Sequence, residues 1–210
     1  MKVTLGPHLV TGRFAVTLHP HHTRLRDVRR GDAVIFFVRD PLTRFVSGFY
    51  SRQRKGQPRS YSEWTPDEKE AFEFFATPNE LALALSSPDA DRSRRAACAM
   101  KTIRHVRDSY WKWFESEAYF RARAADVLFV GRQERLPADF ERLKQVLGLP
   151  DEAALPCDPV RAHRNPRKLD YKLDETAVKN LRHWYRDEWK FLDLCRTLVE
   201  QPAASRAEAA

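Results

Sequence analysis

A chain of 210 residues with 42% hydrophobic composition can bury a core and is typical of one domain of ordinary size. Its three cysteines are far apart and form no C-x-x-C pair, which argues against a zinc site and against a disulfide framework. The formal charge of +8 indicates an anionic partner without naming it, because nucleotides, acidic polysaccharides, nucleic acids and acidic lipids would all be attracted.

The sequence shows neither an apolar run of about eighteen residues nor the pattern of a signal peptide. Zinc-finger spacing, an RNP-type aromatic motif and a heptad repeat are also missing, which disfavours a nucleic-acid partner. We therefore expect a cytoplasmic protein with no membrane span in the chain as given. We expect one domain over residues 1–200 and a disordered Ala-, Ser- and Glu-rich tail over residues 201–210.

The N-terminal segment predicts short strands over residues 2–5 and 13–18, followed by a cluster of histidines at His19, His21 and His22. Three neighbouring histidines raise the question of a metal site. No constellation of Asp, Glu or Cys completes such a site, so we expect no metal. The alternative to any functional role is that these three histidines are solvent-exposed side chains of a loop.

Residues 33–38 are six apolar residues in a row and predict a strand buried on both faces, an inner strand of a parallel sheet. Asp40 ends this run and suits the N-cap of a helix, and Pro41 suits its first position. The helix that follows has a core-facing stripe with helical spacing: Leu42, Phe45, Val46, Phe49 and Tyr50.

Arg44 and Ser47 lie on another flank of this predicted helix, away from the apolar stripe. Since Asp40 already occupies the helix cap, an anion would lie beside the corner and be bound by Arg39 and the Ser47 hydroxyl. The alternative is a packing helix whose arginines pair with Asp40 or with solvent.

The rest of the chain is mainly helical. Residues 52–70 predict a surface loop in which Tyr61 and Trp64 either face a sugar or attach the loop to the body. The remaining expected elements are helices over residues 68–75, 79–86 and 91–120, a strand over 127–130, a helix over 137–147 ended by Gly148, an irregular stretch over 150–172 and a packing helix over 175–198.

The segment from Arg39 to Tyr50 resembles the 3′-phosphate-binding signature of sulfotransferases, which has the pattern R-D-P-x-x-R-x-x-S-x-x-Y. It is most similar to the Golgi-type carbohydrate sulfotransferases and their bacterial relatives. Residues 126–134 and 139–143 resemble the later strand and helix of that family, and residues 163–168 its basic, Asn-containing loop. The resemblance runs from about His19 to Cys195.

The resemblance implies an α/β fold of the P-loop NTPase-like sulfotransferase type, with a central parallel sheet flanked by helices. It implies 3′-phosphoadenosine 5′-phosphosulfate as co-substrate. Its 3′-phosphate would be bound by Arg39 and Ser47, with Arg44 supporting the corner and with Arg164 and Lys168 assisting.

The family also has a His-bearing segment before this strand, which makes His21 or His22 the candidate base for the acceptor hydroxyl. Sulfuryl transfer resembles phosphoryl transfer, in which the protein mainly positions the reactants and neutralises charge. A metal is then not required if cationic side chains do the neutralising.

The family's donor loop, of Pro-Lys-Thr-Gly-Thr-Thr type, is not found in this sequence; the only N-terminal Thr-Gly pair, Thr11-Gly12, has no lysine. The donor part of the fold is therefore either encoded upstream of Met1 or lost. Two hypotheses stay open. One is a sulfotransferase acting on a hydroxyl acceptor, in the first place a carbohydrate, which could itself be acidic. The other is a truncated relative that binds a nucleotide or polyanion without turnover.

Overall fold

The protein is described here by a computed structural model that covers residues 8–11, 14–158, 160 and 169–200. These residues divide into two compact units. Unit 1 contains residues 1–39, 109–162 and 190–210, and unit 2 contains residues 40–108 and 163–189. Each unit combines segments distant in sequence, so the single domain expected over residues 1–200 stays a prediction.

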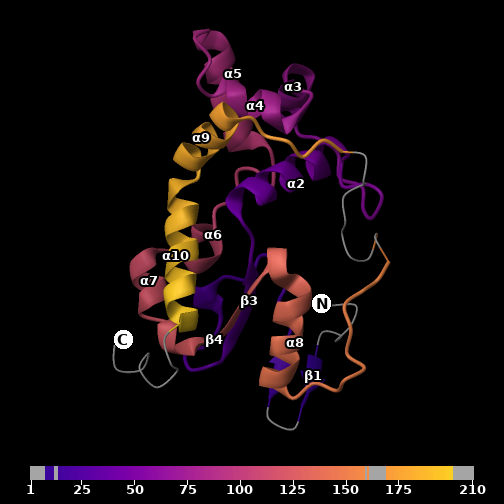
Figure 1. The fold of residues 1–210 in the computed structure, drawn as a ribbon, viewed down its shortest axis with the longest axis vertical. Helices are drawn as coiled ribbons and strands as arrows, with labels where there is room; N and C mark the ends of the chain where they lie inside the picture. Colours follow the sequence, from indigo (N-terminus) through magenta and orange to yellow (C-terminus); the bar gives the residue numbers. More distant parts are fainter. Residues whose placement is uncertain (1–7, 12–13, 159, 161–168, 201–210) are drawn as a thin grey trace. The chain divides into compact units, whose positions relative to one another are not determined.

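Unit 1 is built on a parallel pair of strands, β3 (Val34–Val38) and β4 (Val127–Arg132), drawn side by side in Figure 1. This confirms the mixed α/β class and the parallel pairing. As predicted, side chains of β3 pack into cores on both faces of the sheet, but only Val38 is fully buried and the other four are partly buried. Among the described residues β4 is the only strand that pairs with β3, so within them β3 lies at an edge of the sheet and is not the predicted inner strand. A run of apolar residues reports hydrophobicity, not the number of neighbouring strands.

A close approach between the two strands explains one glycine. Phe37 of β3 lies opposite Gly131 of β4, and a Cβ added to Gly131 would lie 2.2 Å from the Phe37 ring. Any larger residue at position 131 would have to displace that ring. Gly131, within the segment 126–134 that resembles the family's later strand, is therefore a packing requirement of this sheet.

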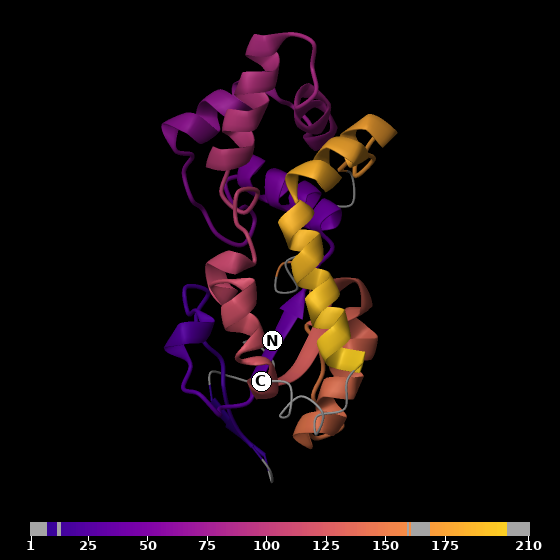
Figure 2. The same cartoon turned by 90° about the vertical axis from the view of Figure 1, so that its left-hand side faces the viewer.

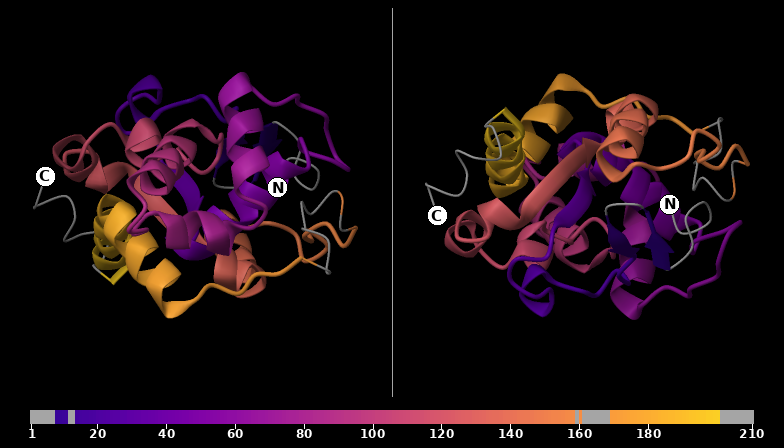
Figure 3. Two further views of the ribbon diagram at one scale, coloured as in Figure 1. Left: turned by 90° about the horizontal axis from the view of Figure 1, so that it is seen from above. Right: turned by 90° about the horizontal axis from the view of Figure 1, so that it is seen from below.

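Helices cover both faces of this sheet (Figure 3, right). On one face, α8 (Leu136–Leu147) packs with Ile35, Phe37 and Phe129. The other face carries the elements α6 (Trp111–Phe114), α7 (Glu117–Arg121) and the part of α10 (Arg186–Glu200) that belongs to unit 1. Phe191 lies at the centre of that layer, with its ring centroid 4.7 Å from that of Phe114. As predicted, Gly148 ends α8 in a left-handed conformation.

The N-terminal part of unit 1 is an antiparallel hairpin of β1 (His8–Val10) and β2 (Ala15–Thr17). Thr11 begins its turn, where its backbone N–H donates to the Phe14 carbonyl at 2.8 Å. Thr11, from the only N-terminal Thr-Gly pair, thus lies between two antiparallel strands, whereas a donor loop would join a strand to a helix. Residues 2–5 and Gly12 lie outside the described residues.

Unit 2 is helical. Its elements are α2 (Pro41–Gln53), α3 (Pro66–Phe74), α4 (Pro78–Ala84), α5 (Ala90–Thr102) and α9 (Glu175–Trp184). Phe45, Val46, Phe49 and Tyr50 of α2 are buried in the shared core, which confirms most of the predicted apolar stripe. In the same core α4 contacts α5 and α9, and α3 contacts α5 (Figure 2).

Two long predicted helices are interrupted. The helix expected over residues 91–120 is broken after Thr102 into α5, α6 and α7, with positive φ angles at His105 and Glu115. The helix expected over 175–198 divides at Tyr185, whose buried hydroxyl donates to the Val106 carbonyl at 2.8 Å. Successive short helices that bury the same face keep the periodicity of one long helix, so sequence alone misses these breaks.

None of the described helices is both long and apolar enough to cross a lipid bilayer. The cytoplasmic location expected from the sequence stays a prediction. The tail over residues 201–210 lies outside the described residues.

Candidate functional site

The start of α2 is capped by its own sequence. The Asp40 carboxylate accepts hydrogen bonds from the backbone N–H groups of Leu42 at 2.9 Å and Thr43 at 3.0 Å. Pro41 occupies the first helical turn, where it lacks an N–H that would need a partner. The predicted cap is confirmed. Because the Asp40 carboxylate already occupies the N-terminus of α2, a bound anion there would be repelled.

The backbone of Arg39 is anchored at the end of β3. Its N–H donates to the Tyr110 hydroxyl at 2.7 Å, and that hydroxyl donates to the Arg39 carbonyl at 2.9 Å. One buried tyrosine thus satisfies both backbone groups where the strand ladder stops. Sequence reasoning missed Tyr110, because it lies 71 residues further along the chain.

The two candidate residues on the polar flank of α2, Arg44 and Ser47, differ in their hydrogen bonding. Arg44 donates to Glu188 at 2.8 Å, and its guanidinium lies 5.8 Å from the centre of the Tyr185 ring. Its side chain is only 16% exposed, so Arg44 attaches α2 to the rest of unit 2. The Ser47 hydroxyl is half-buried and has no hydrogen-bond partner among the described residues. A helical serine often donates a hydrogen bond to a carbonyl of the preceding turn. Ser47 makes no such bond to a described residue, so its hydroxyl is available to a ligand.

Next to Ser47, Gly48 permits a close contact within unit 2. A Cβ on Gly48 would lie 3.2 Å from the Cβ of His105. His105 has a φ of +69°, a backbone conformation that residues other than glycine seldom adopt. The turn after α5 is therefore pressed against α2 beside the candidate serine.

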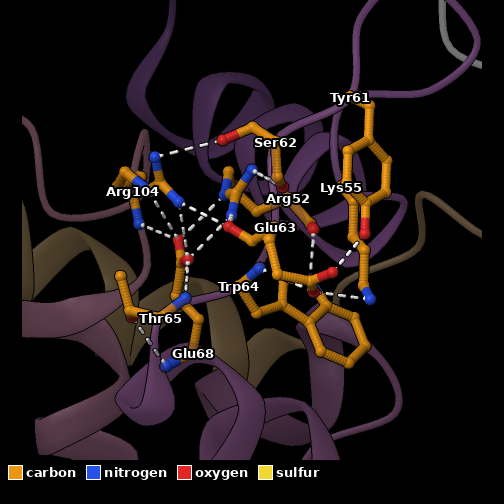
Figure 4. Close-up of polar contacts among 9 residues, drawn as sticks. All are labelled: Arg52, Lys55, Tyr61, Ser62, Glu63, Trp64, Thr65, Glu68 and Arg104. Carbon is orange, nitrogen blue, oxygen red and sulfur yellow. Dashed lines mark hydrogen bonds and ion pairs between the residues drawn. The ribbon is translucent and has the colours of Figure 1, made fainter.

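A buried ion cluster holds the far end of α2 (Figure 4). Glu68 is fully buried and accepts from Arg52 Nε at 2.8 Å and Nη2 at 2.7 Å, from the Arg104 backbone N–H at 2.9 Å and from the Thr65 backbone N–H at 3.0 Å. Burial alone would raise the pKa of Glu68, but these hydrogen bonds hold it well below its usual range. The cluster joins α2, α3 and the turn after α5 into one scaffold.

The loop between α2 and α3 uses one of its aromatic residues for attachment. The Trp64 indole N–H donates to the Arg52 carbonyl at 2.7 Å, and Lys55 Nζ lies 4.6 Å from the centre of the Trp64 ring (Figure 4). Tyr61 is 61% exposed, and its hydroxyl donates to the Glu63 carboxylate. Of the two alternatives for this loop, attachment to the body therefore describes Trp64, and Tyr61 stays open to solvent.

The candidate bases lie in an exposed turn of unit 1. The backbone carbonyl of His21 accepts from the Trp113 indole at 2.7 Å. The imidazoles of His21 and His22 are exposed, and within the described part of the chain neither has a hydrogen-bond partner. That part also contains no group of three or more His, Cys, Asp or Glu side chains able to hold a metal ion.

The predicted basic loop over residues 163–168, with Arg164 and Lys168, lies outside the described residues. The chain is described again from Leu169, which packs against the core of unit 2. The next residue, Asp170, accepts through its carbonyl a hydrogen bond of 2.7 Å from the Tyr50 hydroxyl. The last residue of the signature segment therefore binds the chain where it leaves the basic loop.

Comparison with known proteins agrees with these features. Residues 13–194 match the model of the sulfotransferase family. Searches of curated proteins and of solved structures found no match. Because the family model covers most of the sequence, including the signature segment from Arg39 to Tyr50, the chain belongs to the sulfotransferase family.

Proposed function

We propose that the chain transfers a sulfuryl group from 3′-phosphoadenosine 5′-phosphosulfate to a hydroxyl acceptor, and that the acceptor is a carbohydrate. The observation that carries the donor assignment is the unpartnered Ser47 hydroxyl on α2 within the sulfotransferase signature segment. The positive charge of the chain supports an anionic donor and suits an acidic acceptor.

In this proposal the Arg39 guanidinium and the Ser47 hydroxyl bind the 3′-phosphate of the donor. The anchoring of the Arg39 backbone by Tyr110 supports this role, because it fixes the point from which the side chain departs. Arg44 contributes by supporting α2 through Glu188. Arg164 and Lys168 assist the nucleotide as cations.

The reaction is an in-line exchange at sulfur. The acceptor oxygen forms a bond to sulfur while the bond from sulfur to the bridging oxygen of the 5′-phosphate breaks, which releases 3′-phosphoadenosine 5′-phosphate. The proton of the acceptor hydroxyl passes to the neutral imidazole of His21 or His22. Cationic side chains offset the charge on the transferring and leaving oxygens, so the step as proposed needs no metal ion.

Calorimetric titration tests the donor site. We expect 3′-phosphoadenosine 5′-phosphate to bind more tightly than adenosine 5′-phosphate, which lacks the 3′ group. Charge-assisted hydrogen bonds contribute about 1.5–3 kcal/mol, so Arg39→Ala and Ser47→Ala should each lower this affinity about ten- to a hundredfold. Ser51→Ala, one helical turn further along α2, is the matched control and should leave the affinity unchanged. Unchanged affinity in the Arg39 and Ser47 variants would refute the assignment.

One observation favours a second candidate, a nucleotide-binding relative without turnover. The sequence has no Lys-bearing donor loop of the family type, and that loop neutralises the leaving 5′-phosphate in relatives with the full pattern. Both candidates bind 3′-phosphoadenosine 5′-phosphate. They differ in whether the chain, given the sulfated donor and a panel of carbohydrates, forms a sulfated product.

A further inference from the structure

Unit 1 contains a cavity of about 260 Å³ at the carboxyl end of β4. Its wall includes the strand ends at Val38 and Arg132 and, from the adjoining turn and helices, Arg135, Asp139, Arg142 and Arg196. We call it the arginine cavity. In open α/β sheets ligands bind outside the carboxyl ends of the strands, so the position of the cavity suits a binding site.

The charges around the cavity do not balance. Guanidinium nitrogens of Arg135 and Arg142 lie 3.7 and 3.5 Å from Asp139 Oδ1, distances that fit ion pairs but exceed ordinary hydrogen bonds. Arg196 pairs with Asp193 at 3.2 Å. The Arg132 guanidinium makes no hydrogen bond or ion pair with any described residue. Positive charge is therefore in excess among the residues that line the cavity.

The single carboxylate of the wall is only half satisfied. Asp139 is 2% exposed, and its Oδ2 accepts from the Arg132 backbone N–H at 2.8 Å. Its Oδ1 is buried without any hydrogen bond. Leaving a buried acceptor unpaired costs about 1–3 kcal/mol, which a ligand that donates a hydrogen bond would recover.

Three residues that line the cavity carry no charge: Val38, Val130 and Cys195. Burial raises the pKa of the Cys195 thiol to about 12, although the nearby Arg132 acts in the opposite direction. The thiol therefore stays protonated near neutral pH and adds no negative charge that would oppose an anion.

We propose that the arginine cavity binds a small anionic sugar, meaning a ligand that carries an oxyanion group and free hydroxyls on one ring. The oxyanion is bound by the arginines, and a ring hydroxyl donates to Asp139 Oδ1. An ionised inorganic oxyanion would pair with the arginines but would donate no hydrogen bond to Asp139 Oδ1. The inference rests on the residues of unit 1 alone and does not require sulfuryl transfer.

Titration of the full chain with glucose 6-sulfate tests the proposal, with glucose and methyl sulfate as probes that carry only one of the two features. We expect glucose 6-sulfate to bind at least about tenfold more tightly than either, because it makes the arginine contacts and the Asp139 contact together. Equal affinities for glucose 6-sulfate and methyl sulfate would overturn the role of Asp139. No binding of glucose 6-sulfate would overturn the proposal as a whole.

Variants then assign the binding to this cavity. Arg142→Gln should lower the affinity for glucose 6-sulfate about tenfold or more. Arg121→Gln is the matched control: it removes one positive charge from an exposed arginine of unit 1 that pairs with Glu117 on α7, and it should leave the affinity unchanged. Equal losses in the two variants would show a general attraction to positive charge. Asp139→Ala, which has no polar group to contact a ring hydroxyl, should remove the preference for glucose 6-sulfate over methyl sulfate, provided that its thermal unfolding shows it to be folded.

A competition experiment separates this site from the nucleotide site. With saturating 3′-phosphoadenosine 5′-phosphate present, the affinity for glucose 6-sulfate should be unchanged, and it should also be unchanged in Ser47→Ala. Displacement by the nucleotide would assign the arginines to the donor site and overturn the proposal. Failure of the donor site alone would remove nucleotide binding and leave the binding of glucose 6-sulfate intact.

Discussion

Each unit of the protein contains a buried carboxylate among arginines, and the two differ in how completely they are satisfied. Glu68 in unit 2 receives hydrogen bonds on both oxygens from Arg52 and from two backbone N–H groups. Asp139 in unit 1 receives one, on Oδ2, and its Oδ1 has none. Burial of a charge is therefore common to both sites, and hydrogen-bond saturation distinguishes a scaffold from a candidate ligand site.

The difference follows from where the arginines are attached. Arg52 lies on α2 and Arg104 in the turn after α5, so both reach Glu68 from elements other than its own helix (Figure 4). Arg135 and Arg142 are four residues before and three residues after Asp139. Helical neighbours at these spacings run along the surface and make weak, solvent-screened pairs. Their side chains are 61% and 51% exposed, so they can turn towards a ligand.

The largest expected effect is at the saturated cluster. Glu68→Gln leaves the buried Arg52 without its counter-charge, and breaking a buried pair in this way costs about 3–5 kcal/mol. Urea unfolding followed by circular dichroism measures the loss. Glu70→Gln, which breaks an exposed pair with Arg95, is the control and should cost less than about 1 kcal/mol. Similar losses in both variants would mean that Glu68 is not a scaffold.

Acid should weaken the same cluster. The pKa of Glu68 is lowered in the folded state from an ordinary value of 4.5, so the folded state holds its proton less readily than the unfolded state. The stability from this group is complete above the unfolded pKa and is lost as pH falls below about 4.5 towards the lowered folded pKa. Between pH 5 and pH 3 the wild type should lose more unfolding free energy than Glu68→Gln. Parallel curves for the two proteins would contradict the assignment.

The parts of the candidate site that the sequence predicted are those formed by neighbouring residues. The corner between β3 and α2 was predicted correctly, because the Asp40 cap, Pro41 and the apolar stripe act over a few neighbouring residues. The Tyr110 anchor of Arg39 and the Glu188 partner of Arg44 were not, because they lie 71 and 144 residues away in sequence.

Other features depended on tertiary contacts in the same way. The break after Thr102 depends on a left-handed residue, His105, packed against Gly48. The arginine cavity joins β4 and α8 to Arg196 of α10, which no local pattern connects. Sequence patterns thus predict elements and their caps, whereas the partners of a charged side chain become known only from the fold.

A smaller effect is expected at the unsaturated carboxylate. Asp139→Asn keeps an acceptor for the Arg132 N–H but removes the counter-charge of the neighbouring arginines, two of which are largely exposed to solvent. We expect a loss of about 1 kcal/mol in unfolding free energy, well below that of Glu68→Gln. Urea unfolding under the same conditions measures it. A loss as large as that of Glu68→Gln would make Asp139 a second scaffold and end the contrast between the clusters.

The smallest effect on stability is expected for Arg142→Gln, and it tests the contrast between the Glu68 and Asp139 clusters most directly. Arg142 pairs with Asp139 only at 3.5 Å, and its guanidinium lies 5.7 Å from the centre of the Phe129 ring, so Arg142→Gln should change the unfolding free energy by less than about 0.5 kcal/mol. Thermal unfolding without ligand measures this, and repetition with glucose 6-sulfate should show less stabilisation of the variant than of the wild type. This result would show that the Arg142 guanidinium contributes to ligand binding but hardly to the stability of the free protein. If Arg142→Gln instead lowered stability in the free protein as much as Glu68→Gln does, the excess charge of the cavity would be structural, and saturation would not separate the two kinds of cluster.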